Sequence, residues 1–258
     1  MNLDGIFHLP LLTGGLAALL LAWCGLILRL RGESLAALSY AQAGGLGMVA
    51  APLLGLPPLP GALLGAGAAA ALKPWLARSA DGLIALLLAT WGLSLLLIAN
   101  LPSGDHVGRM MLDGQLYFTR QEHALGLALA LAAALALLPG LTLGIQREQL
   151  FPTQAASKAQ NLQIELLLAA SLAVVAASLG VMAAFALAFL PARMAFQLAS
   201  RWSQALLFAL ALGLTAHLVA FFLALRFDQP YAPVLTLILL IATAGITWFK
   251  APEKALSN

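Results

Sequence analysis

Carboxylate and imidazole side chains gather in one polar stretch of the chain, residues 102–122 and the position that adjoins it. They are Asp105, His106, Asp113, Glu122 and His123. Oxygen and imidazole groups are ligands that divalent metal ions accept in proteins, so this stretch is a candidate for metal capture. Its spacing matches no fixed ligand template, and connections between apolar segments are ordinarily polar. A metal-capturing loop and an ordinary polar loop therefore both remain open.

Two further ionisable residues fall in apolar surroundings. His217 sits in the middle of an apolar segment between Ala216 and Leu218. An ionisable residue inside a membrane span is a candidate functional site, and the alternative is a hydrogen bond between helices. Glu165 lies near the start of its segment, where we expect it to reach the membrane interface or to pair with a nearby residue.

Several catalytic motifs are missing from the sequence. No Gly-x-x-x-x-Gly-Lys pattern precedes any of the four lysines, so the chain cannot hydrolyse ATP through a P-loop. There is no His-Glu-x-x-His motif, no nucleophile elbow and no pair of carboxylates within an apolar segment. The single Cys24 excludes a disulfide within the chain and a cysteine metal cluster. We therefore expect neither an enzyme nor a cofactor bound by this chain.

The amino-acid composition indicates which kind of structure holds these residues. Of the 258 residues, 62% are hydrophobic and 9% are charged, whereas soluble domains have about 45–50% and about 25%. A soluble protein of this length could not bury so much apolar surface, so the sequence predicts an all-α, polytopic membrane protein in a single domain, residues 1–258. The net charge of +3 reports membrane topology rather than affinity for nucleic acid.

The chain contains nine apolar segments near the length of about 17–25 residues that a membrane span needs. The first lacks a cleavage pattern and is expected to be a span rather than a signal peptide. The boundary between the sixth and seventh segments is weakest, because only Gly180 offers a place to turn; one long helix with a re-entrant piece is the alternative, which would leave eight spans. The segments are 7–28, 35–55, 59–76, 82–101, 123–143, 163–183, 184–199, 203–225 and 231–249.

The distribution of basic residues predicts the orientation. With the N-terminus outside and the C-terminus inside, ten of the thirteen basic residues fall on the cytoplasmic side, as the positive-inside rule requires. The three outer ones are Arg109, Arg120 and Arg226. The ten inner ones are Arg29, Arg31, Lys73, Arg78, Arg147, Lys158, Arg193, Arg201, Lys250 and Lys254. Residues 102–122 then form an outer loop, and residues 144–162 form a cytoplasmic segment.

Glycines recur where neighbouring helices would touch. Gly61 and Gly65 form a small-x-x-x-small pattern, which lets two helix backbones approach closely. The other members of these clusters are Gly14, Gly15, Gly44, Gly45, Gly47 and Gly67. The pattern predicts tight helix packing and no specific function.

The cytoplasmic segment 144–162 contains small residues that follow a proline. A short helix beginning near Thr153 would present them as a docking surface for another protein, and an ordinary cytoplasmic loop is the alternative. The residues expected to make the contact are Phe151, Pro152, Thr153, Ala155, Ala156, Ser157 and Lys158.

Four local patterns occur in an order that resembles a known family. They are Gly114-Gln115-Leu116 with Thr119 and Glu122, the run Ala183–Arg193 that ends in Pro-Ala-Arg, the turn Phe227-Asp228-Gln229-Pro230, and the segment Pro152–Asn161. From about Arg29 to Gly245 the chain resembles the permease subunits of ABC importers for zinc and manganese. In such a permease, Pro152–Asn161 corresponds to the coupling helix that seats in the ATPase subunit.

The resemblance implies a homodimeric permease in the bacterial cytoplasmic (inner) membrane. It implies alternating access driven by a separate ABC ATPase that uses ATP, with a solute-binding protein delivering cargo from outside. The cargo would be zinc, manganese or a metal complex. The alternatives are an ABC permease for a non-metal small substrate, or a secondary transporter driven by an ion gradient, although that class usually carries intramembrane acids or inverted repeats.

The chain departs from the family at the expected metal path. The family has an aspartate and, four residues later, a histidine in its second span, and these positions are Leu38 and Gln42 here. A histidine common in the fourth span corresponds approximately to Thr90. Neither Leu nor Gln is a good ligand for Zn²⁺, so we expect weaker contacts or a chelated cargo. The expected path residues are Leu38, Ser39, Tyr40, Gln42, Thr90 and His217.

Overall fold

A computed structural model describes residues 7–76, 79–102, 104–114, 116–118, 121–150 and 158–255. All regular elements in these ranges are helices, as the composition predicts. They are α1 (His8–Leu30), α2 (Ser34–Ala50), η1 (Ala51–Leu54), α3 (Pro58–Leu76), α4 (Ala80–Asn100), α5 (Gly104–Asp113), η2 (Leu116–Phe118), α6 (Gln121–Leu150), α7 (Lys158–Leu179), α8 (Val181–Leu198), α9 (Trp202–Phe227) and α10 (Tyr231–Ala255).

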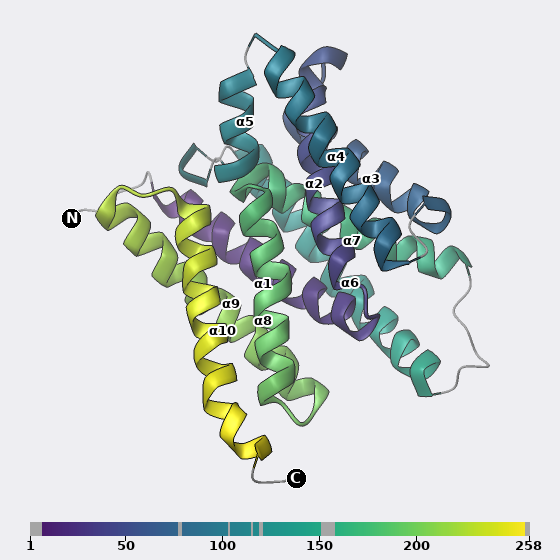
Figure 1. The fold of residues 1–258 in the computed structure, drawn as a ribbon, viewed down its shortest axis with the longest axis vertical. Helices are drawn as coiled ribbons and strands as arrows, with labels where there is room; N and C mark the ends of the chain where they lie inside the picture. The colour runs from purple at the N-terminus through teal and green to yellow at the C-terminus, as the bar shows by residue number, and fades with distance from the viewer. Residues whose placement is uncertain are drawn as a thin grey trace.

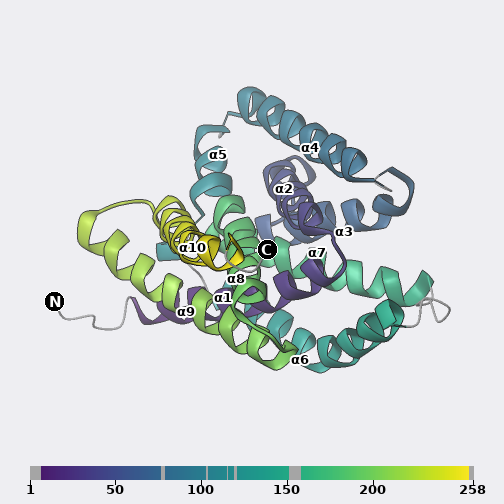
Figure 2. The ribbon, with the colours of Figure 1, turned by 60° about the horizontal axis from the view of Figure 1, so that its bottom comes forward.

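The helices form one bundle with α1 passing through its middle (Figure 1). Helix α1 contacts α6, α7, α8 and α9. Helices α9 and α10 lie at one side of the bundle, and α3 and α4 lie at another (Figure 2). Helix α2 packs among α3, α4, α7 and α8, so four of the six predicted path residues belong to an interior helix, whereas Thr90 lies on α4 and His217 on α9.

Each of the nine apolar segments of the sequence folds as a helix. Among the described residues, seven helices are long and apolar enough to cross a membrane, and α3 and α6 are the remaining two of the nine. The sixth and seventh segments are two helices, α7 and α8. Their boundary was misplaced by three residues, because the chain turns at Gly180, whose φ of 91° a side chain would disfavour.

The prediction that residues 102–122 form a loop is wrong for most of that range. Helix α5 and the short helix η2 occupy it, and their apolar residues join the core. Val107 and Met111 lie one helical turn apart and are buried, as is Leu116. Helix α5 contacts α2, α4, α7, α8 and α10. The polar residues around Val107 and Met111 made the helical spacing of these apolar residues hard to recognise in the sequence.

Glycines permit the close approach of α2 and α3. A Cβ atom at Gly47 would overlap the backbone of Gly61 and Gly65, and one at Gly65 would overlap the carbonyl of Ala43. The predicted small-residue contact is therefore present. Gly67 does not belong to it, since a Cβ there would meet no described atom within 4 Å.

Two helix boundaries follow from local chemistry. The Ser79 hydroxyl accepts a hydrogen bond from the Gly82 amide at 3.3 Å and caps the start of α4. Asp228, with φ 52°, ends α9 in the left-handed conformation, and Pro230 precedes α10. The Phe227–Pro230 pattern thus forms the turn between the last two helices.

Candidate functional site

The predicted path residues on α2 are directed toward different neighbours. The Ser39 hydroxyl lies 3.1 Å from the carbonyl oxygens of Leu35 and of Leu83 on α4, so it links α2 to α4. Tyr40 is fully buried, and its hydroxyl donates a hydrogen bond to Glu165 on α7. Leu38 is partly buried. Ser39 therefore contacts α4, whereas Tyr40 contacts α7.

Gln42 is a buried polar side chain with an unsatisfied donor. It is 5% exposed, and its Nε2 finds no hydrogen-bond partner among the residues that the structure describes. Gln42 stands three positions after Ser39 and three before Gly45, so all three follow one side of α2. Gly45 adjoins Met111 of α5 and Val181 of α8. A buried amide without a partner is costly, and a ligand that accepts a hydrogen bond would satisfy it.

Thr90 and His217 both use their polar atoms inside the protein. The Thr90 hydroxyl lies 2.9 and 3.0 Å from the carbonyls of Leu86 and Leu87 in its own helix. His217 is fully buried, with Nδ1 2.7 Å from the Tyr231 hydroxyl and Nε2 3.0 Å from the Leu11 carbonyl. Because a carbonyl can only accept, Nε2 carries the proton and Nδ1 accepts from Tyr231. His217 thus makes the interhelical hydrogen bonds considered above.

A cluster of four charges lies where α1, α2, α3 and α7 meet. Glu165 is 5% exposed, and its Oε1 lies 2.7 Å from both Arg31 Nη2 and Lys73 Nζ. Glu33 Oε2 lies 2.6 Å from Lys73 Nζ and 3.1 Å from Arg31 Nε. Tyr40 completes the set through Glu165. We call these five residues the Glu165 cluster. Its two negative and two positive charges leave it with no net charge.

The expectation for Glu165 was wrong in one respect. Its partners Arg31, Tyr40 and Lys73 lie 134, 125 and 92 residues away in the chain, so the pairing is not local. The sequence held a partial signal, because all four charges stand near the ends of apolar segments. Tertiary packing decides which helix ends lie together, and a single sequence does not show that packing.

The surroundings keep Arg31 and Glu33 ionised. Burial of the Arg31 guanidinium acts to lower its pKa, but the negative charges of Glu165 and Glu33 outweigh it and the pKa is raised. Burial acts to raise the pKa of Glu33, but the Lys73 hydrogen bond and the Arg31 charge hold that pKa below its usual value. Both groups are therefore charged at neutral pH.

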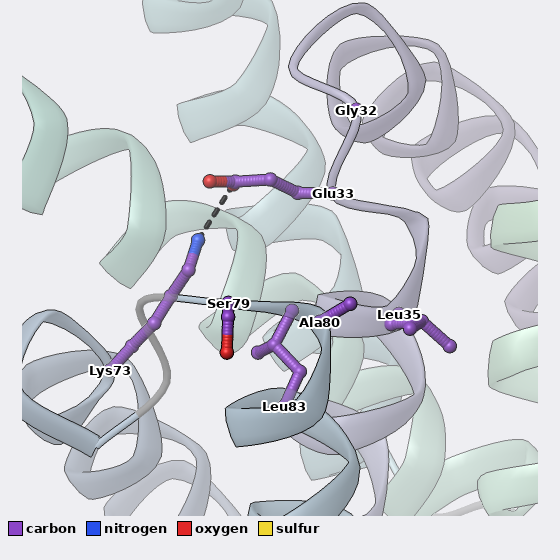
Figure 3. Close-up of a pocket in the computed structure, with 7 residues that line it drawn as sticks. All are labelled: Gly32, Glu33, Leu35, Lys73, Ser79, Ala80 and Leu83. Carbon is purple, nitrogen blue, oxygen red and sulfur yellow. Dashed lines mark ion pairs between the residues drawn. The ribbon is translucent and has the colours of Figure 1, made fainter.

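A cavity of about 190 Å³ adjoins the cluster. It is lined by Gly32, Glu33, Leu35, Lys73, Ser79, Ala80 and Leu83. Figure 3 shows the Lys73 ammonium directed at the Glu33 carboxylate across this space. The cavity therefore contains one ion pair of the cluster and the start of helix α4.

The predicted outer-loop ligands do not form a metal site in the part of the chain that the structure describes. His106 is exposed on α5, and no group of three or more His, Cys, Asp or Glu side chains in that part could hold a metal ion. The side chains of Asp105, Asp113, Glu122 and His123 lie outside the described residues. Their role stays a prediction.

Most of the predicted docking segment also lies outside the described residues. Phe151, Pro152, Thr153, Ala155, Ala156 and Ser157 are not described, and Lys158 is described only as the first residue of α7. Helix α6 ends at Leu150, so both flanks of the segment are helical. The segment joins α6 to the helix that carries Glu165.

Two solved structures have a fold similar to that of this chain. The chain is similar to PsaBC from Streptococcus pneumoniae, solved in complex with Fab, with 17% identity and a TM-score of 0.81 over 95% of this chain and 92% of that one. It is also similar to an ABC transporter described as metal-chelate type, solved in an inward-facing conformation, with 15% identity and a TM-score of 0.75 over 93% of this chain and 85% of that one. No curated protein sequence matches.

These likenesses show that the bundle has the fold of ABC transporter permeases. The family model of the ABC 3 transport family matches residues 6–250, which is almost the whole chain. That span includes the interior helix α2, the Glu165 cluster and the two helices α6 and α7 that flank the predicted docking segment. The chain is thus a membrane permease that belongs to the ABC 3 transport family.

Proposed function

We propose that this permease imports a transition metal or a metal complex across the bacterial inner membrane. It works as a homodimer with two separate ABC ATPase subunits, and an extracytoplasmic binding protein delivers the cargo. The observation that carries the cargo assignment is Gln42, a buried amide on the interior helix α2 whose donor has no partner in the described part of the chain. The similarity to a metal-chelate-type transporter supports the same cargo class.

The path provides few strong metal ligands. Zn²⁺ prefers sulfur, imidazole or carboxylate, whereas Leu38 is apolar and Gln42 contributes only an amide. Ser39 and Thr90 direct their hydroxyls to backbone carbonyls. A metal that keeps ligands of its own needs fewer protein ligands, and acceptor groups on such a complex suit the free Nε2 of Gln42. The donor set thus favours a chelated metal over a bare ion.

Restoring metal ligands to the path tests this proposal. Leu38→Asp with Gln42→His places a carboxylate and an imidazole one turn apart on α2. We expect the double variant to bind free Zn²⁺ at least about 100-fold more tightly than the native permease, by equilibrium binding in detergent. Gln42→Ala should reduce uptake of a Zn²⁺ chelate by about tenfold or less. Tight stoichiometric binding of free Zn²⁺ to the native protein, lost in Gln42→Ala, would contradict the proposal.

The proposed orientation has its own test. With the N-terminus outside and the C-terminus inside, a reporter fused after Asn258 lies in the cytoplasm. Cysteines introduced at Ser103 and Ser157 should react from opposite sides of the membrane with an impermeant maleimide, Ser103 from outside. Labelling of both positions from outside would refute the orientation, and detergent-permeabilised cells control for reactivity.

A further inference from the structure

We propose that Glu165 is a positioning residue that transmits movement of α7 to the path helix α2 through Tyr40. The inference rests on the proposed function, because it assigns a route by which an ATPase would act on the path. Its residues are all described, and none stands at a position where the family's metal ligands were expected. Tyr40 was expected on the path, but its buried hydroxyl bonds Glu165 instead. The evidence is the geometry of the Glu165 cluster.

Glu165 fixes α7 to three other elements at one point. Arg31 belongs to the turn between α1 and α2, Lys73 to the last turn of α3, and Tyr40 to the second turn of α2. Arg31 and Lys73 also share Glu33. A relative shift of α7 and α2 would separate buried charges from their partners, which is costly in a low dielectric. The two helices are therefore expected to move as one unit.

The hydrogen bond between Glu165 and Tyr40 lies close to the start of α7 at one end and to Gln42 at the other. Glu165 follows Lys158, the first residue of α7, by seven residues, or about two helical turns. The segment just before α7 is the one expected to receive the ATPase. Tyr40 precedes Gln42 by two residues on α2. Helices are stiff over such lengths. A displacement at the start of α7 would therefore reach Gln42 through the packing of α7 against α2, which the hydrogen bond between Tyr40 and Glu165 holds in register.

Tyr40→Phe isolates the link and is expected to fold. It removes the hydroxyl and leaves Glu165 with both of its cations. Ser178→Ala is the matched control, because Ser178 is also buried on α7 but donates to Val174 within its own helix. In the complex with its ATPase, we expect Tyr40→Phe to lower Zn²⁺-chelate transported per ATP hydrolysed by about tenfold. The KM for the chelate, the ATPase rate and the melting temperature should stay near native values in both variants.

A distance measurement tests the link without cargo or ATPase. Spin labels on cysteines at Leu35 of α2 and Leu162 of α7, both exposed, can be placed in a background with the buried Cys24 replaced by alanine. We expect a narrow distance distribution in the full-length native permease and in Ser178→Ala, and a broader one in Tyr40→Phe. Equal widths in all three proteins would overturn the inference.

Variants that change and then restore the net charge of the cluster distinguish a role in transmitting movement from a role in stability. Glu165→Gln leaves one surplus positive charge in the cluster, and adding Lys73→Gln restores neutrality. We expect the double variant to recover the melting temperature lost in Glu165→Gln but not transport per ATP. Recovery of native transport per ATP by the double variant would show that the cluster supplies only stability. If the wild-type complex itself shows no ATP-driven uptake, the proposed function fails, and the spin-label result still decides the link.

Discussion

Gly65→Leu is expected to prevent the accumulation of folded permease, whereas Gly67→Ala, two residues further along α3, should leave it intact. A side chain at Gly65 would occupy the space of the Ala43 carbonyl and approach the backbone of Gly47. These are backbone atoms and cannot swing aside. Even the smaller Gly65→Ala should destabilise the fold by about 1–3 kcal/mol, and leucine by more, because it would force α2 and α3 apart.

Gly67 provides the control on the same helix. A methyl group there meets no described atom within 4 Å, and alanine favours a helix over glycine by about 0.5–1 kcal/mol. The measurement is the yield of monodisperse protein after detergent extraction, with its melting temperature. Normal yield of Gly65→Leu would show that α2 and α3 do not pack as the structure has them.

The second large effect is expected in the predicted docking segment. Replacing Ala155 or Ala156 with arginine should weaken binding of the ATPase by about 30-fold or more, or about 2 kcal/mol. The added bulk and charge would stand in a packed contact without a partner. ATP-driven uptake should be lost while the permease still inserts and keeps its native melting temperature.

The matched control is Ala155→Ser, which keeps the residue small and should bind the ATPase normally. Binding is measured by titrating the purified ATPase onto permease in nanodiscs, and transport in vesicles. Native affinity and uptake in both arginine variants would show that residues 151–158 form only a connecting loop.

The helices could be predicted from the sequence because their signal is local. An apolar segment of about 20 residues has few alternatives to a helix in a bilayer, and all nine such segments are helical. Gly180 was recognised as the only place to turn in the run 166–190, although the boundary was set at residues 183 and 184 and one long helix was left as the alternative. Helix α5 was missed because its few apolar residues stand among charged ones, and its burial depends on α2, α4 and α8.

The Glu165 cluster could not be predicted for a related reason. Its members come from four parts of the chain, and the separations of 92 to 134 residues leave no periodic trace. Arg31 and Lys73 were interpreted only as topology signals, although both are paired with acids. The Gln42 donor likewise became notable only when the structure buried it without a partner in the described residues.

The most direct test of the account is the energy source for uptake. The permease is reconstituted in vesicles with its ATPase and binding protein, and uptake of radioactive Zn²⁺ is followed with and without a chelator. All ion gradients are collapsed with ionophores. We expect the chelate to accumulate only with hydrolysable ATP on the cytoplasmic face, and accumulation to stop when the ATPase cannot hydrolyse it. Accumulation by the permease alone, driven by an ion gradient and indifferent to ATP, would contradict this expectation.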